Sequence, residues 1–303
     1  MTATTATKIG FVGLGHMGGN MAARLLDAGY AVHGETRNRK HLQSTELDRL
    51  QWHQTPREVA EATDIVFTSL PDDGVLDTVA SGTHGILAGL RAGQIWIEMS
   101  TVSPRASRKL AERVHSTGAS LLDAPVSGSV PQAQAGTLTI MVGGQEEVYA
   151  RVEALLRLLG TPTYIGDHGQ GLSLKLAINI SLAVQMLAFA EGLDLATRAG
   201  VDRQLAVEVM TRSAIGSPML KARAPLVLDL PDNAWFDVGL MQKDLRLALD
   251  LGADVRAPLP STAAADNVLD IARAAGYEHR DIAVLYRLLA EAPEATLEPR
   301  RPR

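Results

Sequence analysis

A lysine and an asparagine four residues apart interrupt an otherwise apolar segment. The polar side chains between positions 172 and 190 are Ser173, Lys175, Asn179, Ser181 and Gln185. In a helix Lys175 and Asn179 would share one face. Taking an ammonium out of water without a partner costs several kcal/mol. The pair therefore either extends to solvent or faces a site that uses a proton donor and a hydrogen-bonding amide.

A second group of residues suited to chemistry is the glycine-rich stretch "GLGHMG", which matches G-x-G-x-x-G directly after an apolar strand pattern. This context is typical of a turn that binds a dinucleotide pyrophosphate at a helix N-terminus. Gly13 would permit the tight turn, Gly15 the approach of a phosphate, and Gly18 the packing of helix on strand. The expected cofactor contacts are Gly13, Leu14, Gly15, His16, Met17 and Gly18. A plain glycine-rich turn is the alternative.

The end of the second predicted strand, "GETRNRK", bears on which dinucleotide is bound. An acid such as Glu35 would bind both ribose hydroxyls of NAD, whereas an arginine would pair with the 2′-phosphate of NADP. Thr36, Arg37 and Asn38 look like a phosphate cradle. We therefore expect NADP, with NADPH preferred and NAD still possible. For Arg37 and Arg39 a solvated turn is the alternative.

Alternating strand and helix patterns must position these residues. Strand patterns cover 8–13, 31–36, 64–70, 94–100, 119–126, 137–144 and 162–166, and helical patterns cover 21–30, 103–118 and 146–160. Beyond residue 168 only helical patterns remain, at about 170–199, 202–213, 217–227, 239–252, 259–275 and 279–290. This order predicts an α/β Rossmann-type doubly wound dinucleotide-binding domain over residues 1–168 and an all-α domain over 169–303.

Two predicted strands end where such a fold forms its ligand crevice. Leu70 and Pro71 close "FTSLP", and Thr101 follows "IWIEMS". We expect all three to line the cofactor site, with Thr101 contacting the nicotinamide ribose or the substrate. The alternative for Thr101 is a helix N-cap.

The composition excludes several classes of protein. The 303 residues are 46% hydrophobic, carry a net charge of −5 and include no cysteine, which excludes a disulfide framework or a thiolate site. The charge indicates no nucleic-acid partner, and the histidines show no metal-ligand spacing. Residues 1–8 lack the apolar core of a secretory signal. The absence of cysteine fits a reducing cytoplasm, so we expect a cytoplasmic protein. Polar residues interrupt the apolar run 172–190, which we interpret as a helix buried between domains or subunits, so we expect no membrane partner.

Four motifs in order along the chain resemble the β-hydroxyacid dehydrogenase family, which includes 3-hydroxyisobutyrate dehydrogenase. They are "GFVGLGHMGGNMAARLL", "DAPVSGS", "GQGLSLKLAIN" and "QKDLRLAL", within residues 8–290. "IGSPMLKARAP", Ile178 and Phe236 point to the glyoxylate and succinic semialdehyde reductase branch. Ser129 replaces a usual glycine, and Glu35 stands where an aromatic residue is common.

The resemblance implies a role for each motif. Lys175 stabilises the substrate oxyanion and transfers a proton, and Asn179 orients it or the substrate. Ser127, Gly128 and Ser129 hold the substrate carboxylate. Phe236 forms a pocket wall, and Lys243 packs over the nicotinamide with Asp244 positioning it. The alternatives are core packing for Phe236 and Met219 and a surface ion pair for Lys243.

The expected function is an NAD(P)-dependent oxidoreductase that interconverts a small β-hydroxy acid and its semialdehyde or keto acid. An imine reductase on the same scaffold and a non-catalytic NADP-binding module are the alternatives; Lys175 argues against the first. Because the segment 172–190 is apolar on nearly all faces, part of it should be buried against a second copy. We expect a homodimer or homotetramer.

Overall fold

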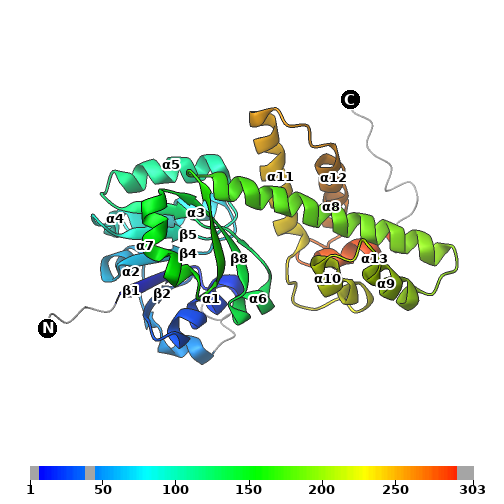
Figure 1. Ribbon diagram of the computed structural model, residues 1–303, viewed down its shortest axis with the longest axis horizontal. Coiled ribbons are helices and arrows are strands. Elements are labelled where there is room, and N and C mark those ends of the chain that lie inside the picture. Colours follow the sequence, from blue (N-terminus) through cyan, green and yellow to red (C-terminus); the bar gives the residue numbers. More distant parts are fainter. Residues whose placement is uncertain (1–6, 38–44, 292–303) are drawn as a thin grey trace. The chain divides into compact units, whose positions relative to one another are not determined.

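The computed structural model describes residues 7–37 and 45–291 (Figure 1). The chain divides into two compact units, Met1–Lys175 and Leu176–Arg303. The first unit contains a nine-stranded, largely parallel sheet with helices, and the second unit is helical. The predicted fold class is therefore confirmed.

The sheet of the first unit has the strand order of a dinucleotide-binding fold. Its parallel part runs β3–β2–β1–β4–β5–β6. These strands are β1 (Lys8–Val12), β2 (Ala31–Glu35), β3 (Gln51–Trp52), β4 (Ile65–Thr68), β5 (Ile95–Glu98) and β6 (Ser120–Asp123). β8 (Leu138–Gly144) is antiparallel to β6 and to β7 (Val126–Ser127), and β9 (Gly160–Gly166) is parallel to β8. The strand order reverses between β1 and β4, which is where such folds bind ligands.

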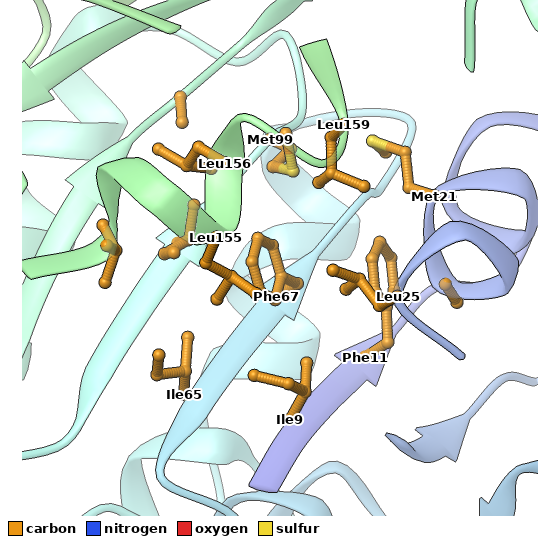
Figure 2. Packing of buried hydrophobic residues seen from close by; sticks show 14 of the residues in the cluster. Ile9, Phe11, Met21, Leu25, Ile65, Phe67, Met99, Leu155, Leu156 and Leu159 are labelled. Carbon is orange, nitrogen blue, oxygen red and sulfur yellow. The ribbon is translucent and has the colours of Figure 1, made fainter. Parts of the chain in front are cut away.

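Alternating strand residues enter two separate cores, one on each face of the sheet. Ile9, Phe11, Ile65 and Phe67 share a core with residues of α1 (His16–Asp27), α6 (Val130–Ala135) and α7 (Glu146–Leu156). Figure 2 shows these side chains together, and the rings of Phe11 and Phe67 stack with centroids 5.6 Å apart. Strand residues whose side chains point to the other face, such as Trp96, pack with α2 (Pro56–Ala62), α3 (Asp73–Ala80), α4 (Ile86–Gly89) and α5 (Pro104–His115). The sheet is thus covered by helices on both faces.

The second unit has its own apolar core, to which its helices and the 3₁₀ turn Ile282–Val284 contribute. The helices are α8 (Gln170–Arg198), α9 (Arg203–Arg212), α10 (Pro218–Leu228), α11 (Val238–Val255), α12 (Pro260–Ala274) and α13 (Leu285–Glu291). α8 contains the division between the two units, since Lys175 ends the first and Leu176 begins the second. By length and composition α8 could cross a membrane, since an 18-residue window within it has a mean hydropathy of 1.7, but core helices share these properties.

The structure corrects some of the predicted elements. The predicted helix 279–290 is wrong in its first part: the extended backbone of Asp281 precedes a 3₁₀ turn, Ile282–Val284, and α13 follows. The helix predicted over 21–30 begins earlier, at His16, and ends at Asp27, before Gly29 takes a left-handed conformation. The short elements β3, β7, α2, α3, α4 and α6 were not predicted as separate elements, because two to eight residues carry too little periodicity.

Candidate active site

The glycine loop joins β1 to α1 at the edge of the sheet where the strand order reverses. Gly13 has φ of +88°, and a Cβ atom there would lie 2.4 Å from the carbonyl oxygen of Ser69. A Cβ on Gly18 would lie 2.0 Å from the carbonyl oxygen of Gly13. A Cβ on Gly15, in contrast, would meet no protein atom within 4 Å. Gly13 and Gly18 are therefore needed by the protein's own packing, whereas Gly15 leaves space in front of its backbone.

The N-terminus of α1 differs from several other helix starts in the same unit. Thr55, Asp72 and Ser103 cap α2, α3 and α5 by accepting a backbone N–H. The N-cap of α1 is Gly15, which offers no side-chain acceptor, and its first turn has no acidic residue. The first amides of a helix attract anions. The open space at Gly15 and this start of α1 fit the pyrophosphate of a dinucleotide.

The predicted crevice residues after β4 lie beside this loop. A Cβ on Gly13 would also lie 2.8 Å from Leu70 Cδ2. The Leu70 N–H donates to Ser100 Oγ at 2.7 Å, which ties the ends of β4 and β5 together. Pro71 is exposed and Thr101 is half-buried. The alternative that Thr101 caps a helix is wrong, because Ser103 is the N-cap of α5.

The cofactor-selecting residues lie at the end of β2, which is paired with β1. The Gly13 N–H donates to the Glu35 carbonyl oxygen at 3.1 Å, so the glycine loop and this strand end are adjacent. Glu35 and Thr36 are half-buried, and Arg37 is exposed. Asn38 and Arg39 lie outside the described residues. Glu35 and Arg37 therefore both remain candidates for contact with the adenosine ribose.

The segment "DAPVSGS" leaves β6 and continues through β7 into α6. Ser127 and Ser129 are half-buried and Gly128 is exposed, with φ of +132°. A Cβ on Gly128 would lie 2.8 Å from Leu138 Cδ2, so this turn requires glycine. The Ser129 N–H donates to Gln132 Oε1 at 2.9 Å. The turn thus carries two hydroxyl groups, those of Ser127 and Ser129.

Lys175 and Asn179 occupy successive turns of α8, as the spacing predicted. Lys175 is 8% exposed and Asn179 is fully buried. Lys175 therefore does not extend freely into solvent. Asn179 Oδ1 is buried and has no hydrogen-bond partner among the described residues. An acceptor left in this state is suited to a donor on a ligand.

Asn179 is held in the second unit by a carboxylate from α11. Asn179 Nδ2 donates to Asp244 Oδ2 at 2.6 Å, and the Lys243 ammonium lies 2.9 Å from Asp244 Oδ1. Because an ionised carboxylate only accepts, this contact fixes which end of the Asn179 amide faces Asp244. Asp244 is 2% exposed and the Lys243 side chain is 23% exposed. Lys243 thus forms a half-buried ion pair rather than a fully exposed one.

Phe236 lies in a turn that a buried ion pair holds in place. Asp281 accepts hydrogen bonds from the N–H groups of Trp235 and Phe236 at 2.9 and 3.2 Å. Arg223 donates to both oxygens of Asp281 at 2.9 and 3.0 Å. Phe236 and Met219 are half-buried against the core of the second unit. Arg223 and Asp281 were not among the predicted site residues. Arg223 lies within "IGSPMLKARAP", but its partner is 58 residues away and nothing local indicates the pairing.

Asp123 was also missed as a site residue, although it begins the motif "DAPVSGS". It is fully buried at the end of β6 and bonds to the start of α8. An acid that closes an apolar strand was the available signal. In the described ranges, no group of three or more His, Asp or Glu side chains could hold a metal ion.

Comparison with known proteins assigns the family. The family described as the NAD binding domain of 6-phosphogluconate dehydrogenase matches residues 8–166, and the one described as NAD-binding of NADP-dependent 3-hydroxyisobutyrate dehydrogenase matches residues 169–289. The 2-(hydroxymethyl)glutarate dehydrogenase of Eubacterium barkeri is 36% identical, over 93% of this chain and 94% of that protein. The chloroplastic glyoxylate/succinic semialdehyde reductase 2 of Arabidopsis thaliana is 32% identical, over 94% of this chain and 80% of that protein.

Solved structures share the fold of this chain. Psf3 in complex with NADP⁺ and 2-OPP is 26% identical, with a TM-score of 0.84 over 93% of this chain and 99% of that one. An imine reductase from Pseudomonas sp. is 24% identical, with a TM-score of 0.62 over 94% of this chain and 100% of that one. It shares the fold alone. The chain belongs to the β-hydroxyacid dehydrogenase family. It is an NAD(P)-dependent dehydrogenase of the β-hydroxyacid type.

Proposed function

We propose that the enzyme reduces a small aldehyde or keto acid with NADPH, reversibly toward the corresponding hydroxy acid. The observation that carries this proposal is the buried pair on α8, Lys175 and Asn179, with Asn179 anchored by Asp244. A buried ammonium one turn from a buried, unsatisfied amide oxygen is an arrangement for handling a hydroxyl proton. The relatives named above act on 2-(hydroxymethyl)glutarate, glyoxylate and succinic semialdehyde, each of which combines a carboxylate with an alcohol or aldehyde.

Residues of the first unit would hold the cofactor. The backbone from Gly13 to Gly18 and the uncapped start of α1 would bind the pyrophosphate, and Thr36 and Arg37 the 2′-phosphate. Leu70, Pro71 and Thr101 would line the nicotinamide side of the crevice. When bound, the nicotinamide supplies or accepts the hydride.

Lys175 would manage the charge that develops on the substrate oxygen. Its ammonium stabilises this oxygen during reduction and gives it a proton from Nζ. In the oxidative direction the neutral amine removes the hydroxyl proton. Asn179 Oδ1 would accept a hydrogen bond from the Lys175 ammonium or from the substrate hydroxyl, and so keep the two groups oriented.

The substrate carboxylate would bind at the turn after β7. The hydroxyl of Ser127 and the backbone amide of Gly128 would provide donors without an arginine, whereas the Ser129 amide already donates to Gln132 Oε1. Phe236 would form an apolar wall whose backbone is fixed by Asp281. Lys243, paired with Asp244, would pack beside the nicotinamide.

Helices α8 and α9 would also join two copies of the chain. Leu174 and Leu195 on α8 are 40% and 72% exposed, and Leu205 and Val209 on α9 are 53% and 57% exposed. Exposed apolar groups of this size are typical of protein interfaces. A sedimentation mass near 32 kDa at micromolar concentration would exclude the proposed homodimer or homotetramer.

Steady-state oxidation of NADPH with a panel of substrates tests the function. The panel comprises succinic semialdehyde, glyoxylate, 2-hydroxy-3-oxopropionate and a cyclic imine, with propanal as a carbonyl control that lacks a carboxylate. We expect turnover with one or more of the acids and much less with propanal. Turnover confined to the imine would favour the imine reductase alternative, which Lys175 argues against. Tight NADPH binding without turnover of any compound would favour a non-catalytic module.

A further inference from the structure

Two motifs that are separate in the sequence meet at one buried carboxylate. Asp123 ends β6 and begins "DAPVSGS", and it is fully buried. Its Oδ1 accepts the N–H of Gly169 at 2.8 Å, and its Oδ2 accepts the N–H of Leu172 at 3.2 Å. Both amides belong to "GQGLSLK", at the start of α8. Both carboxylate oxygens are therefore committed to the helix that carries Lys175.

Glycines make room for this carboxylate. A Cβ on Gly143, which pairs with Asp123 across β6 and β8, would lie 2.7 and 2.8 Å from its two oxygens. A Cβ on Gly171 would lie 3.0 Å from Asp123 Oδ2 and 2.4 Å from the Met141 carbonyl oxygen. Gly169 has φ of +87°, which turns the chain so that its N–H points to Asp123. The surrounding backbone thus fits an aspartate at this position closely.

The electrostatic balance at Asp123 depends on its contacts with α8. Burial raises the pKa of the Asp123 carboxyl, and the N–H groups of Gly169 and Leu172 together with His168 oppose this rise. His168 Nδ1 lies 3.9 Å from Asp123 Oδ1, and burial lowers the pKa of His168. An acceptor at a helix N-terminus satisfies amides that otherwise lack partners and interacts favourably with the helix dipole. Asp123 therefore caps α8 from a different element of the fold.

We propose that Asp123 is a positioning residue that fixes Lys175 relative to the turn Ser127–Ser129. Lys175 follows Leu172 by three residues, about 4.5 Å along the helix axis, and Ser127 follows Asp123 by four. The carboxylate thus fixes the first turn of α8 against the strand from which the substrate turn leaves. This inference rests on the proposed function, in which Lys175 transfers the proton.

Substitution of Asp123 by Asn and by Leu tests the proposal. Asparagine is also a good N-cap but offers one acceptor oxygen, and leucine offers none. We expect kcat to fall by about 10²-fold for Asp123→Leu and by less for Asp123→Asn, with an unchanged dissociation constant for NADPH. Asp167→Asn removes the same charge from an exposed residue just before α8 and should leave kcat unchanged. If Asp123→Leu fails to fold, the kcat of Asp123→Asn alone tests the proposal.

A double-mutant cycle separates positioning from a general loss of stability. If Asp123 acts through Lys175, Asp123→Asn should reduce turnover in the wild-type background but not in Lys175→Met. Equal fold-losses in both backgrounds would overturn the proposal. If Lys175→Met itself turns over normally, the proposed function fails, whatever the Asp123 variants do.

Hydrogen exchange provides a readout that does not depend on activity. In Asp123→Asn and Asp123→Leu, amides in residues 168–176 should exchange faster, while those in α11 should not change. Unchanged protection at the start of α8 would overturn the proposal even if turnover fell in these variants.

Discussion

The phosphate loop of the first unit and the Asn179–Asp244–Lys243 cluster of the second are built in different ways. The loop uses backbone: two glycines are required because side chains would collide with neighbouring carbonyl groups, and a third leaves open space. The cluster uses side chains, with one buried carboxylate holding an amide from α8 and an ammonium from α11. In the loop, a substitution acts by adding atoms. In the cluster, it acts by removing charge or a hydrogen bond.

This difference explains how much of each region can be predicted from the sequence. The loop is made by six consecutive residues, so its spacing alone indicates its use. The contact between Asn179 and Asp244 joins residues 65 positions apart. Which residue pairs with Asn179 depends on how the helices of the second unit pack. The following substitutions test the contrast, starting with the largest expected effect.

The largest effect should come from Lys175, one helical turn before Asn179 on α8. Lys175→Met keeps the length and apolar stem but removes the proton donor, so turnover should fall by about 10²–10⁴-fold. The fold should survive, because a buried ammonium is replaced by a hydrophobic group. Initial rates with a responsive substrate and a thermal melt measure the two effects.

Lys109→Met is the matched control for this substitution. Lys109 is exposed on α5, so the same chemical change there should leave turnover unaltered. Normal turnover of Lys175→Met would contradict the proposed mechanism.

The glycine loop should respond sterically, and differently at two of its positions. Gly18→Ala places a Cβ against the Gly13 carbonyl, so it should destabilise the unit by about 1–3 kcal/mol and weaken NADPH binding. The Cβ added by Gly15→Ala meets no protein atom, so the free energy of unfolding should change by less than about 0.5 kcal/mol. NADPH binding should still be lost. Thermal melts and fluorescence titration with NADPH measure both quantities. Wild-type affinity in Gly15→Ala would refute the assignment of that space to the cofactor.

Much of the first unit could be predicted because its signals are local. Apolar strands of the parallel sheet, the glycine turn and the helix after it are each encoded within a few residues, and the structure confirms them. The short β3 and β7 escaped prediction, since such strands exist only through pairing with a neighbour.

The contacts that hold the candidate site could not be predicted in the same way. The face shared by Lys175 and Asn179 follows from helical spacing, but nothing local to Asn179 indicates Asp244 as its partner. The same holds for Asp281, which fixes the turn at Phe236 from 45 residues away. Buried polar pairs of this kind arise from tertiary packing, so a single sequence shows the residues without their pairing.

The cluster should respond to loss of charge without loss of volume. Asp244→Asn removes the ion pair with Lys243. It also replaces the carboxylate that accepts from Asn179 with an amide, which has one donor group and one acceptor. A hydrogen bond to a charged group contributes about 1.5–3 kcal/mol, so kcat should fall by about tenfold or more, with little change in NADPH affinity. Asp250→Asn, exposed on the same helix, is the control and should behave as wild type. An unaltered kcat in Asp244→Asn would show that the cluster is structural only.

The smallest expected effect, and the sharpest for cofactor choice, concerns Arg37 at the end of β2. We expect the native enzyme to show a lower Michaelis constant for NADPH than for NADH. Arg37→Ala should weaken NADPH alone, by about 1–3 kcal/mol for a charge-assisted contact with phosphate. Arg105→Ala, exposed on α5, should change neither constant.

Salt dependence distinguishes this electrostatic effect from a steric one. Arg37 is exposed, so its attraction to a phosphate should be screened as ionic strength rises. The NADPH advantage of the wild type over Arg37→Ala should therefore shrink at high salt, whereas the loss in Gly15→Ala should persist because added atoms are not screened. A native preference for NADH would instead assign the ribose to Glu35, and Arg37 would then be a solvated turn residue.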